Sequence, residues 1–286
     1  MDKMEETLEA TPYAARLGVV VESLDESSAR LHLPFKEENS NPGDALHGGV
    51  AASMIDLGGL AVAGAALGDE GGPIRTVSIQ VTYLAAAIGE AITAEATLLR
   101  RGKEICFVDI AVATDSGKPI ARGLSTLRGR FAADEAPGVK ALGDEGGSDP
   151  GPMGPHLAGR VPFIGRLGLE VEHMAGGASR IAMPFIEANA NESGGVHEGA
   201  MLALLDTCGA MAAWSVTGPG AFKASTVGVH AHMVAPAAAE DLVAYGRVTQ
   251  RDNEIFWSDV EVARRSDRNV VARGTVLYRI VVPKDA

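Results

Sequence analysis

The chain has 286 residues, of which 46% are hydrophobic and 22% are charged, and its formal net charge is −12. This hydrophobic content is enough for a substantial core and excludes a disordered chain. The acidic balance argues against nucleic acid or an anionic membrane as the main partner, because both are bound through basic surface. The only two cysteines, Cys106 and Cys208, exclude a disulfide scaffold and favour a reducing cytosol.

The first ten residues, MDKMEETLEA, are acidic and lack an apolar core, so we expect no secretory signal and a cytoplasmic protein. Alternating hydrophobic and polar residues then predict strands over 19–24 and 29–35. A loop that holds Asn41 follows these strands. After the loop, an apolar segment from about 49 to 67 predicts one long helix.

The helical segment imitates a membrane span, because residues 48–67 are long enough to cross a bilayer. However, the segment consists mostly of Ala and Gly, and Asp56 near its middle would cost about 2.5–3.5 kcal/mol in lipid. We therefore expect the buried helix of a soluble domain and no membrane partner.

Beyond the helix, the period of the hydrophobic pattern changes to two. Between Thr76 and Thr82, Val77, Ile79 and Val81 point to one face, and the polar residues point to the other. One helix against a mostly antiparallel sheet makes an α+β layer, and its polar sheet face is free for a partner. Three further strands are predicted over 91–99, 105–113 and 120–128.

The second half of the sequence repeats the first at an offset of 150 residues. Between the halves, residues 131–157 are rich in Gly, Pro and acidic residues, as a solvated linker should be. We therefore predict two tandem domains, residues 1–130 and 158–286, that pack as a pseudo-twofold pair. Identical pairs include Pro12 and Pro162, His47 and His197, Gly49 and Gly199, Asp56 and Asp206, and Thr76 and Thr226.

Each repeat carries the same set of polar residues around the start of its helix. Backbone N–H groups at a helix N-terminus attract negative charge and can form an oxyanion hole, and glycine there lets a carbonyl approach closely. A carboxylate on an apolar helix can act as a general base or a nucleophile, with its pKa tuned by burial. Nearby hydroxyl and amide groups can hold the carboxylate or the attacking water. The candidate residues are Asn41, His47, Gly48, Asp56 and Thr76 in the first repeat, and Asn191, His197, Glu198, Asp206 and Thr226 in the second.

Helix geometry separates the candidates within one repeat. Gly48 and Asp56 are eight residues apart, or roughly 12 Å along a helix. One carbonyl carbon cannot touch both residues, so each site must combine the helix start of one repeat with the aspartate of the other. We predict a first composite cluster and a second, pseudo-symmetric one. The first contains Asn41, His47, Gly48, Asp206 and Thr226; the second contains Asn191, His197, Glu198, Asp56 and Thr76.

The segment NPGDALHGGVAASMID closely resembles the motif of PaaI-like hot-dog thioesterases, as do VSIQVTYLAAAIGE and LLRRGKEICF after it. This resemblance implies a long helix wrapped by an antiparallel sheet, dimers with shared sites, and hydrolysis of acyl-CoA or aryl-CoA. It implies Gly48 as oxyanion donor, Asp56 as base or nucleophile, His47 and Asn41 as orienting groups, and assistance from Thr76. No cofactor is implied beyond the CoA moiety of the substrate. The equivalent residues of the second repeat are Glu198, Asp206, His197, Asn191 and Thr226.

The second repeat departs from this motif, because it reads VHEG in place of HGG. A backbone N–H remains at Glu198, but the side chain would crowd the site or repel the phosphates of CoA. The fused pair already supplies the minimal dimer, and its exposed surfaces leave room for a homodimer of the whole chain.

A small basic cluster follows the strand predicted over 91–99. Its members, Arg100, Arg101 and Lys103, would either hold the phosphates of CoA or form a solvated hairpin end. The sequence leaves these two interpretations open.

Two other patterns suggest chemistry less strongly. His230 and His232 lie on one face of a predicted strand, but the first repeat has Gln80 and Thr82 there, so we expect a polar interface and no metal. Cys208 has no base at motif spacing and is interpreted as a core residue.

Two alternative functions remain. A hot-dog hydratase or dehydratase would resemble a pattern with an aspartate five residues before the histidine, where this chain has Pro42 and Glu192. A non-catalytic acyl-CoA sensor would bind the thioester without releasing thiol, so thiol release distinguishes both alternatives from a thioesterase.

Overall fold

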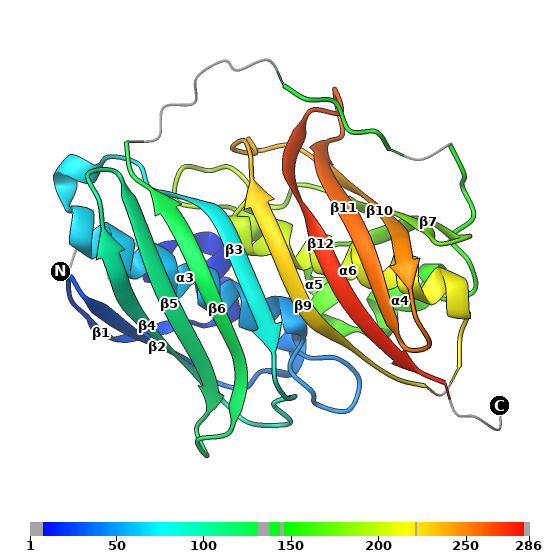
Figure 1. Cartoon of the computed structure of the whole chain (residues 1–286), viewed down its shortest axis with the longest axis horizontal. Helices are drawn as coiled ribbons and strands as arrows, with labels where there is room; N and C mark the ends of the chain where they lie inside the picture. Colours follow the sequence, from blue (N-terminus) through cyan, green and yellow to red (C-terminus); the bar gives the residue numbers. More distant parts are fainter. Residues whose placement is uncertain (1–7, 131–137, 144–145, 221, 283–286) are drawn as a thin grey trace.

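Each repeat forms one long helix and half of a continuous antiparallel sheet in the computed structural model, which describes residues 8–130, 138–143, 146–220 and 222–282 (Figure 1). The first repeat contains α2 (Pro12–Leu17), β1 (Val20–Leu24), β2 (Ser28–Leu33), η1 (Glu37–Asn39), α3 (Gly48–Leu67), η2 (Asp69–Gly71), β3 (Arg75–Tyr83), β4 (Ile92–Arg101), β5 (Ile105–Thr114) and β6 (Pro119–Arg128). The second contains α4 (Gly154–Arg160), α5 (Pro162–Leu167), β7 (Glu170–Ala175), β8 (Ala178–Met183), η3 (Glu187–Asn189), α6 (Glu198–Thr217), β9 (Lys223–Met233), β10 (Leu242–Arg251), β11 (Ile255–Arg264) and β12 (Val270–Val281).

The two repeats share one 12-stranded sheet, with the strand order β1-β2-β4-β5-β6-β3-β9-β12-β11-β10-β8-β7. The order reads the same from either end once equivalent strands are matched, and β3 pairs antiparallel with β9 at its centre. In that pair Gln80 lies opposite His230, its own equivalent at the offset of 150 residues. A pseudo-twofold axis therefore passes between these two residues, which confirms the predicted α+β fold class and the tandem pseudo-twofold arrangement.

Helices α3 and α6 lie side by side on one face of this sheet (Figure 1). By length and composition alone, both are apolar enough to cross a membrane, but 89% of each apolar window is buried inside the protein. Small residues make this burial feasible, since the sheet and the neighbouring helix can approach the backbone closely. The helix predicted over 49–67 thus forms part of the core that both repeats share.

Both long helices begin at a histidine that caps the first turn. The backbone N–H of Gly49 donates to Nδ1 of His47 at 3.0 Å, and the backbone N–H of Gly199 donates to Nδ1 of His197 at 2.9 Å. Such a cap satisfies one of the N–H groups that the first turn of a helix leaves without an intrahelical partner. The cap therefore fixes where each helix starts, and with it the position of the next residue.

The helices touch near their N-termini through small residues. A Cβ added at Gly49 would lie 2.8 Å from Cβ of Ala203 and 3.0 Å from the ring of Phe163. We therefore expect Gly49→Ala to lower the free energy of unfolding by about 1–3 kcal/mol, because the packed side chains must shift. Gly159→Ala is the matched control, since nothing lies within 4 Å of its added Cβ, and alanine favours a helix. Urea denaturation measures both, and equal stabilities for the two variants would contradict this packing account.

Part of the segment predicted as a linker has regular structure. Helix α4 occupies residues 154–160 and buries Leu157, and Ala141 packs with Val243, Ala263 and Val270. The Gly- and Pro-rich composition predicted a linker and not a helix here. The proline of α4 lies in the first turn, where proline is compatible with a helix start. Residues 131–137 and 144–145 of the predicted linker lie outside the described residues.

Candidate active site

The first composite cluster forms where the N-terminus of α3 meets the middle of α6. A Cβ added at Gly48 would lie 3.2 Å from Oδ2 of Asp206, so the carboxylate faces the first residue of the helix from the other repeat. The Gly49 N–H is taken by His47 Nδ1, and the Val50 N–H donates to the His47 carbonyl at 2.9 Å. Among the described residues, this leaves the Gly48 N–H as a first-turn donor without a partner.

The carboxyl group of Asp206 is held on its other side by a hydroxyl. Thr226 Oγ1 donates to Oδ1 of Asp206 at 2.7 Å, and the aspartate is only 4% exposed. Burial raises the pKa of Asp206 to about 6, against the lowering effect of the Thr226 hydrogen bond. Asp206 is therefore mostly ionised at neutral pH, with a pKa close enough to neutrality for it to accept a proton from water.

Two tyrosines, which the sequence analysis did not single out, border this cluster. The hydroxyl of Tyr83 donates to the Gly48 carbonyl at 3.1 Å, and burial, together with Asp206, raises the pKa of Tyr83 well above its ordinary value. Tyr278 lies opposite Thr226 in the β12–β9 pairing and accepts a hydrogen bond from Nε1 of Trp214 at 3.1 Å. Burial raises the pKa of Tyr278 to about 12, with a smaller contribution from Asp206. Both phenols therefore stay protonated beside the carboxylate.

Both histidines of the clusters are buried and neutral. Burial lowers the pKa of His47 to about 4 and that of His197 to about 3. Because Nδ1 of each ring accepts from a backbone N–H, the ring proton lies on Nε2. Their geometry thus gives them the role of helix caps, and a role in orienting the reacting groups stays a prediction.

The second composite cluster brings Asp56 of α3 to the N-terminus of α6. Thr76 Oγ1 donates to Oδ1 of Asp56 at 2.6 Å, and Oδ2 lies 3.8 Å from Nδ1 of His197. Oδ2 is buried without a hydrogen-bond partner among the described residues, and Asp56 is 0% exposed. Burial raises the pKa of Asp56 to about 8, and the nearby charge of Glu198 adds to the rise. Asp56 is therefore mostly protonated at neutral pH, unlike Asp206.

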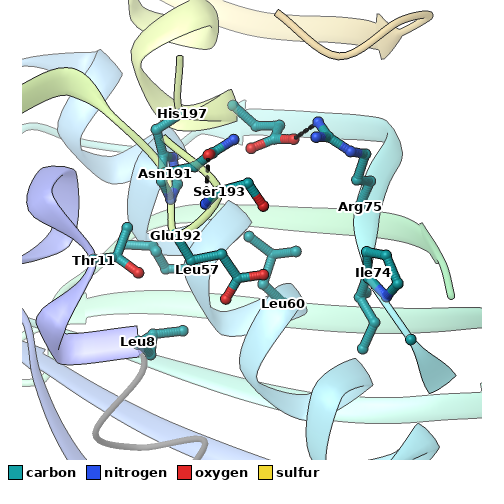
Figure 2. Close-up of a pocket in the computed structure, with 13 residues that line it drawn as sticks. Leu8, Thr11, Leu57, Leu60, Ile74, Arg75, Asn191, Glu192, Ser193 and His197 are labelled. Carbon is teal, nitrogen blue, oxygen red and sulfur yellow. Dashed lines mark hydrogen bonds and ion pairs between the residues drawn. The ribbon is translucent and has the colours of Figure 1, made fainter. Parts of the chain in front are cut away.

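Glu198 occupies the position that corresponds to Gly48, and its side chain is buried. Arg75 donates from Nη1 to Oε1 of Glu198 at 3.1 Å, and this pair borders a cavity of about 110 Å³ (Figure 2). Burial raises the pKa of Glu198, and the Arg75 charge opposes that rise. Leu57, Leu60 and Ile74 form the apolar side of the cavity.

The two asparagines lie in the loop before each long helix. Oδ1 of Asn191 accepts from the backbone N–H groups of Ser193 and Gly195, both at 3.0 Å, so this side chain holds its own turn. Asn41 is half-buried at the start of the matching loop, where its backbone N–H donates to the Ala45 carbonyl at 2.7 Å. Asn191 is thus placed to shape the loop, and it also borders the cavity.

The basic cluster lies at the far end of α3 from Gly48. Nε of Arg101 donates to the Ala66 carbonyl at 2.7 Å, and so caps the C-terminal turn of that helix. Arg100 and Lys103 are exposed in the same hairpin. A contact between this cluster and CoA stays a prediction.

The His230 and His232 rings lie 4.6 Å apart, and Nε2 of His230 is 3.3 Å from the Ser78 hydroxyl at the junction of the repeats. In the described part of the chain, no group of three or more His, Cys, Asp or Glu side chains is arranged to hold a metal ion. Cys106 and Cys208 are both buried, and neither forms a disulfide among the described residues.

The sequence pattern of the thioesterase superfamily matches this chain twice, at residues 43–121 and 193–271. The two matches cover more than half of the chain and share the offset of the internal repeat. The chain therefore belongs to the thioesterase superfamily, in a tandem form of the hot-dog fold. Its general chemistry within that superfamily is thioester hydrolysis.

Known relatives agree with this assignment. A Halobacterium salinarum protein described provisionally as an esterase is 36% identical over 118 residues, which are 40% of this chain and 78% of that protein. Acyl-coenzyme A thioesterase 13 of Mus musculus is 31% identical over 96 residues, 33% of this chain and 67% of that enzyme.

Solved structures show the same fold over nearly the whole chain. A hot-dog protein of Alicyclobacillus acidocaldarius has a TM-score of 0.65 at 16% identity and covers 98% of both chains. A Thermobifida fusca protein, described provisionally as thioesterase II, has a TM-score of 0.68 at 16% identity and covers 95% of this chain and 98% of its own.

Proposed function

We propose that this protein hydrolyses acyl-CoA or aryl-CoA thioesters to the free acid and CoA, with catalysis at a composite site between its two repeats. The observation that carries the proposal is the first composite cluster, where the Asp206 carboxylate faces Gly48, the first helix residue, whose backbone N–H has no partner among the described residues. The name of the mouse relative, an acyl-coenzyme A thioesterase, supports CoA as the thiol part of the substrate.

In the proposed reaction, the thioester carbonyl oxygen binds at the Gly48 N–H, where the positive end of α3 stabilises developing negative charge. Asp206 accepts a proton from a water molecule as the water oxygen bonds to the carbonyl carbon. The tetrahedral oxyanion then collapses, the carbon–sulfur bond breaks, and the departing thiolate takes the proton from Asp206. Thr226 holds the carboxylate in place through its 2.7 Å hydrogen bond.

The proposed base predicts how the rate depends on pH. Since Asp206 has a pKa raised to about 6 and must be ionised to act, kcat/KM should level off above pH 6 and fall as pH drops below it. The fall should be about tenfold per pH unit for one proton. Thr226→Val removes the hydrogen bond that lowers this pKa, so the variant should shift the midpoint upward. A profile that is flat from pH 5 to 8 would contradict the role of Asp206.

Thiol release separates the proposal from its alternatives. The wild-type protein is incubated with short, long and aromatic acyl-CoAs, and free thiol is followed with a chromogenic reagent. A hydratase or dehydratase would change the acyl group and leave the thioester intact. An acyl-CoA sensor would bind the thioester and release no thiol. We further propose that the protein acts in the cytoplasm on small-molecule substrates, without a cofactor of its own.

A further inference from the structure

The two composite clusters differ at the residue that starts the long helix, which is Gly48 in one and Glu198 in the other. We propose that Glu198 and Arg75 together close the second cluster to thioesters, so that the chain has a single catalytic site. This inference rests on the proposed function, and it assigns the chemistry to Asp206 alone.

The pseudo-twofold symmetry shows where a side chain at this position must go. A Cβ at Gly48 would lie 3.2 Å from the Asp206 carboxylate and 3.5 Å from the Tyr83 ring. Glu198 has such a side chain, and it lies close enough to Asp56 for its charge to raise the pKa of that aspartate. By the pseudo-twofold symmetry, the Cβ of Glu198 lies between the helix start and Asp56, and its carboxylate extends to Arg75.

The oxyanion donor of the second cluster lies near a carboxylate. The backbone N–H of Glu198, which corresponds to the N–H of Gly48, lowers the pKa of the Glu198 carboxyl group against the larger effect of burial. A substrate carbonyl at this N–H would have to compete with that carboxylate. Charge-assisted hydrogen bonds are stronger than those to a neutral carbonyl oxygen, so the competition disfavours the substrate.

Arg75 stabilises the Glu198 side chain in this position. The residue that corresponds to Arg75 in the second repeat is Ser225, so the first composite cluster lacks both members of the pair. The side chains of Arg75 and Glu198 are only 19% and 7% exposed, and Arg75 supplies a cation to the buried Glu198 carboxylate. The cavity of about 110 Å³ that the pair borders is smaller than a typical ligand pocket of about 300–1,000 Å³.

The aspartate behind the pair is poorly suited to act as a base. Oδ2 of Asp56 is buried without a hydrogen-bond partner among the described residues, and the pKa of Asp56 is raised to about 8. A protonated carboxyl group cannot accept a proton from water. Burial is the larger cause of this raised pKa and the Glu198 charge the smaller one, so replacing Glu198 and Arg75 should lower the pKa of Asp56 and open the space in front of it to water and substrate.

The test gives the second cluster the two residues that the first cluster has at the equivalent positions. In wild type, titration calorimetry with a non-hydrolysable thioether analogue of an acyl-CoA substrate should give one equivalent bound per chain. The double variant Arg75→Ser/Glu198→Gly should bind two equivalents. In an Asp206→Asn background, the same double change should raise thiol release at least tenfold, through Asp56.

The control Arg75→Met/Glu198→Gln keeps the bulk of both side chains and should still bind one equivalent. If the glycine variant melts below the assay temperature, Arg75→Ser/Glu198→Ser replaces it. Two equivalents in wild type, or one in the folded double variant, would overturn the closure while leaving the proposed function intact. If wild type neither binds the analogue nor releases thiol, the proposed function fails, and the closure fails with it.

Discussion

Asp206→Asn should lower kcat/KM for thiol release by about a hundredfold or more, because an amide cannot accept the proton of the attacking water. Asp56→Asn should change kcat/KM by less than about threefold. A residue that acts in the transition state would cause a much larger loss. The two aspartates occupy equivalent positions and each bonds a threonine hydroxyl, so they are matched controls for one another. Steady-state kinetics with one good acyl-CoA substrate measures both variants.

The opposite ranking of the two variants' activities would contradict the role proposed for Asp206. If Asp56→Asn lost activity and Asp206→Asn kept it, the second composite cluster would be the working site, despite the Glu198 side chain. Equal losses would mean that both clusters work. Melting curves of both variants are needed, since a variant that unfolds loses activity for an unrelated reason.

Arg75→Ala should lower the free energy of unfolding at pH 8 by about 3 kcal/mol, because it leaves the buried carboxylate of Glu198 without its cation. The loss should depend on pH in a definite direction. Burial raises the pKa of Glu198 in the folded protein. The free energy of unfolding is therefore lowered most at high pH, where the glutamate is ionised in both the folded and the unfolded chain. The penalty should shrink as the pH falls toward the ordinary pKa of glutamate, since the folded state then takes up a proton.

Urea denaturation at several pH values measures this effect. The double variant Arg75→Ala/Glu198→Gln is the control, because it removes the buried charge together with its partner and should recover most of the stability. A loss below about 1 kcal/mol, or one that does not vary with pH, would mean that solvent screens the pair.

The sequence by itself determined the duplicated architecture. The repeat at an offset of 150 residues, the apolar helix and the period-two strands are local patterns, and they predicted the elements within a few residues of their bounds. The rise of a helix was enough to argue that Gly48 and Asp56 cannot share a substrate. The structure places Asp206, rather than Asp56, in front of Gly48.

Only the tertiary structure decided which groups surround the aspartates and what state they are in. Tyr83, Tyr278 and Arg75 come from strands far along the chain, and their contacts depend on how the sheet lays those strands beside the helices. The sequence analysis foresaw crowding by Glu198 but not its partner, since Arg75 lies 123 residues away in the other repeat. The difference between a pKa of about 6 and one of about 8 at two equivalent aspartates likewise arises from burial and neighbouring charge. Those quantities exist only once the chain has folded, because they depend on distances in space rather than along the sequence.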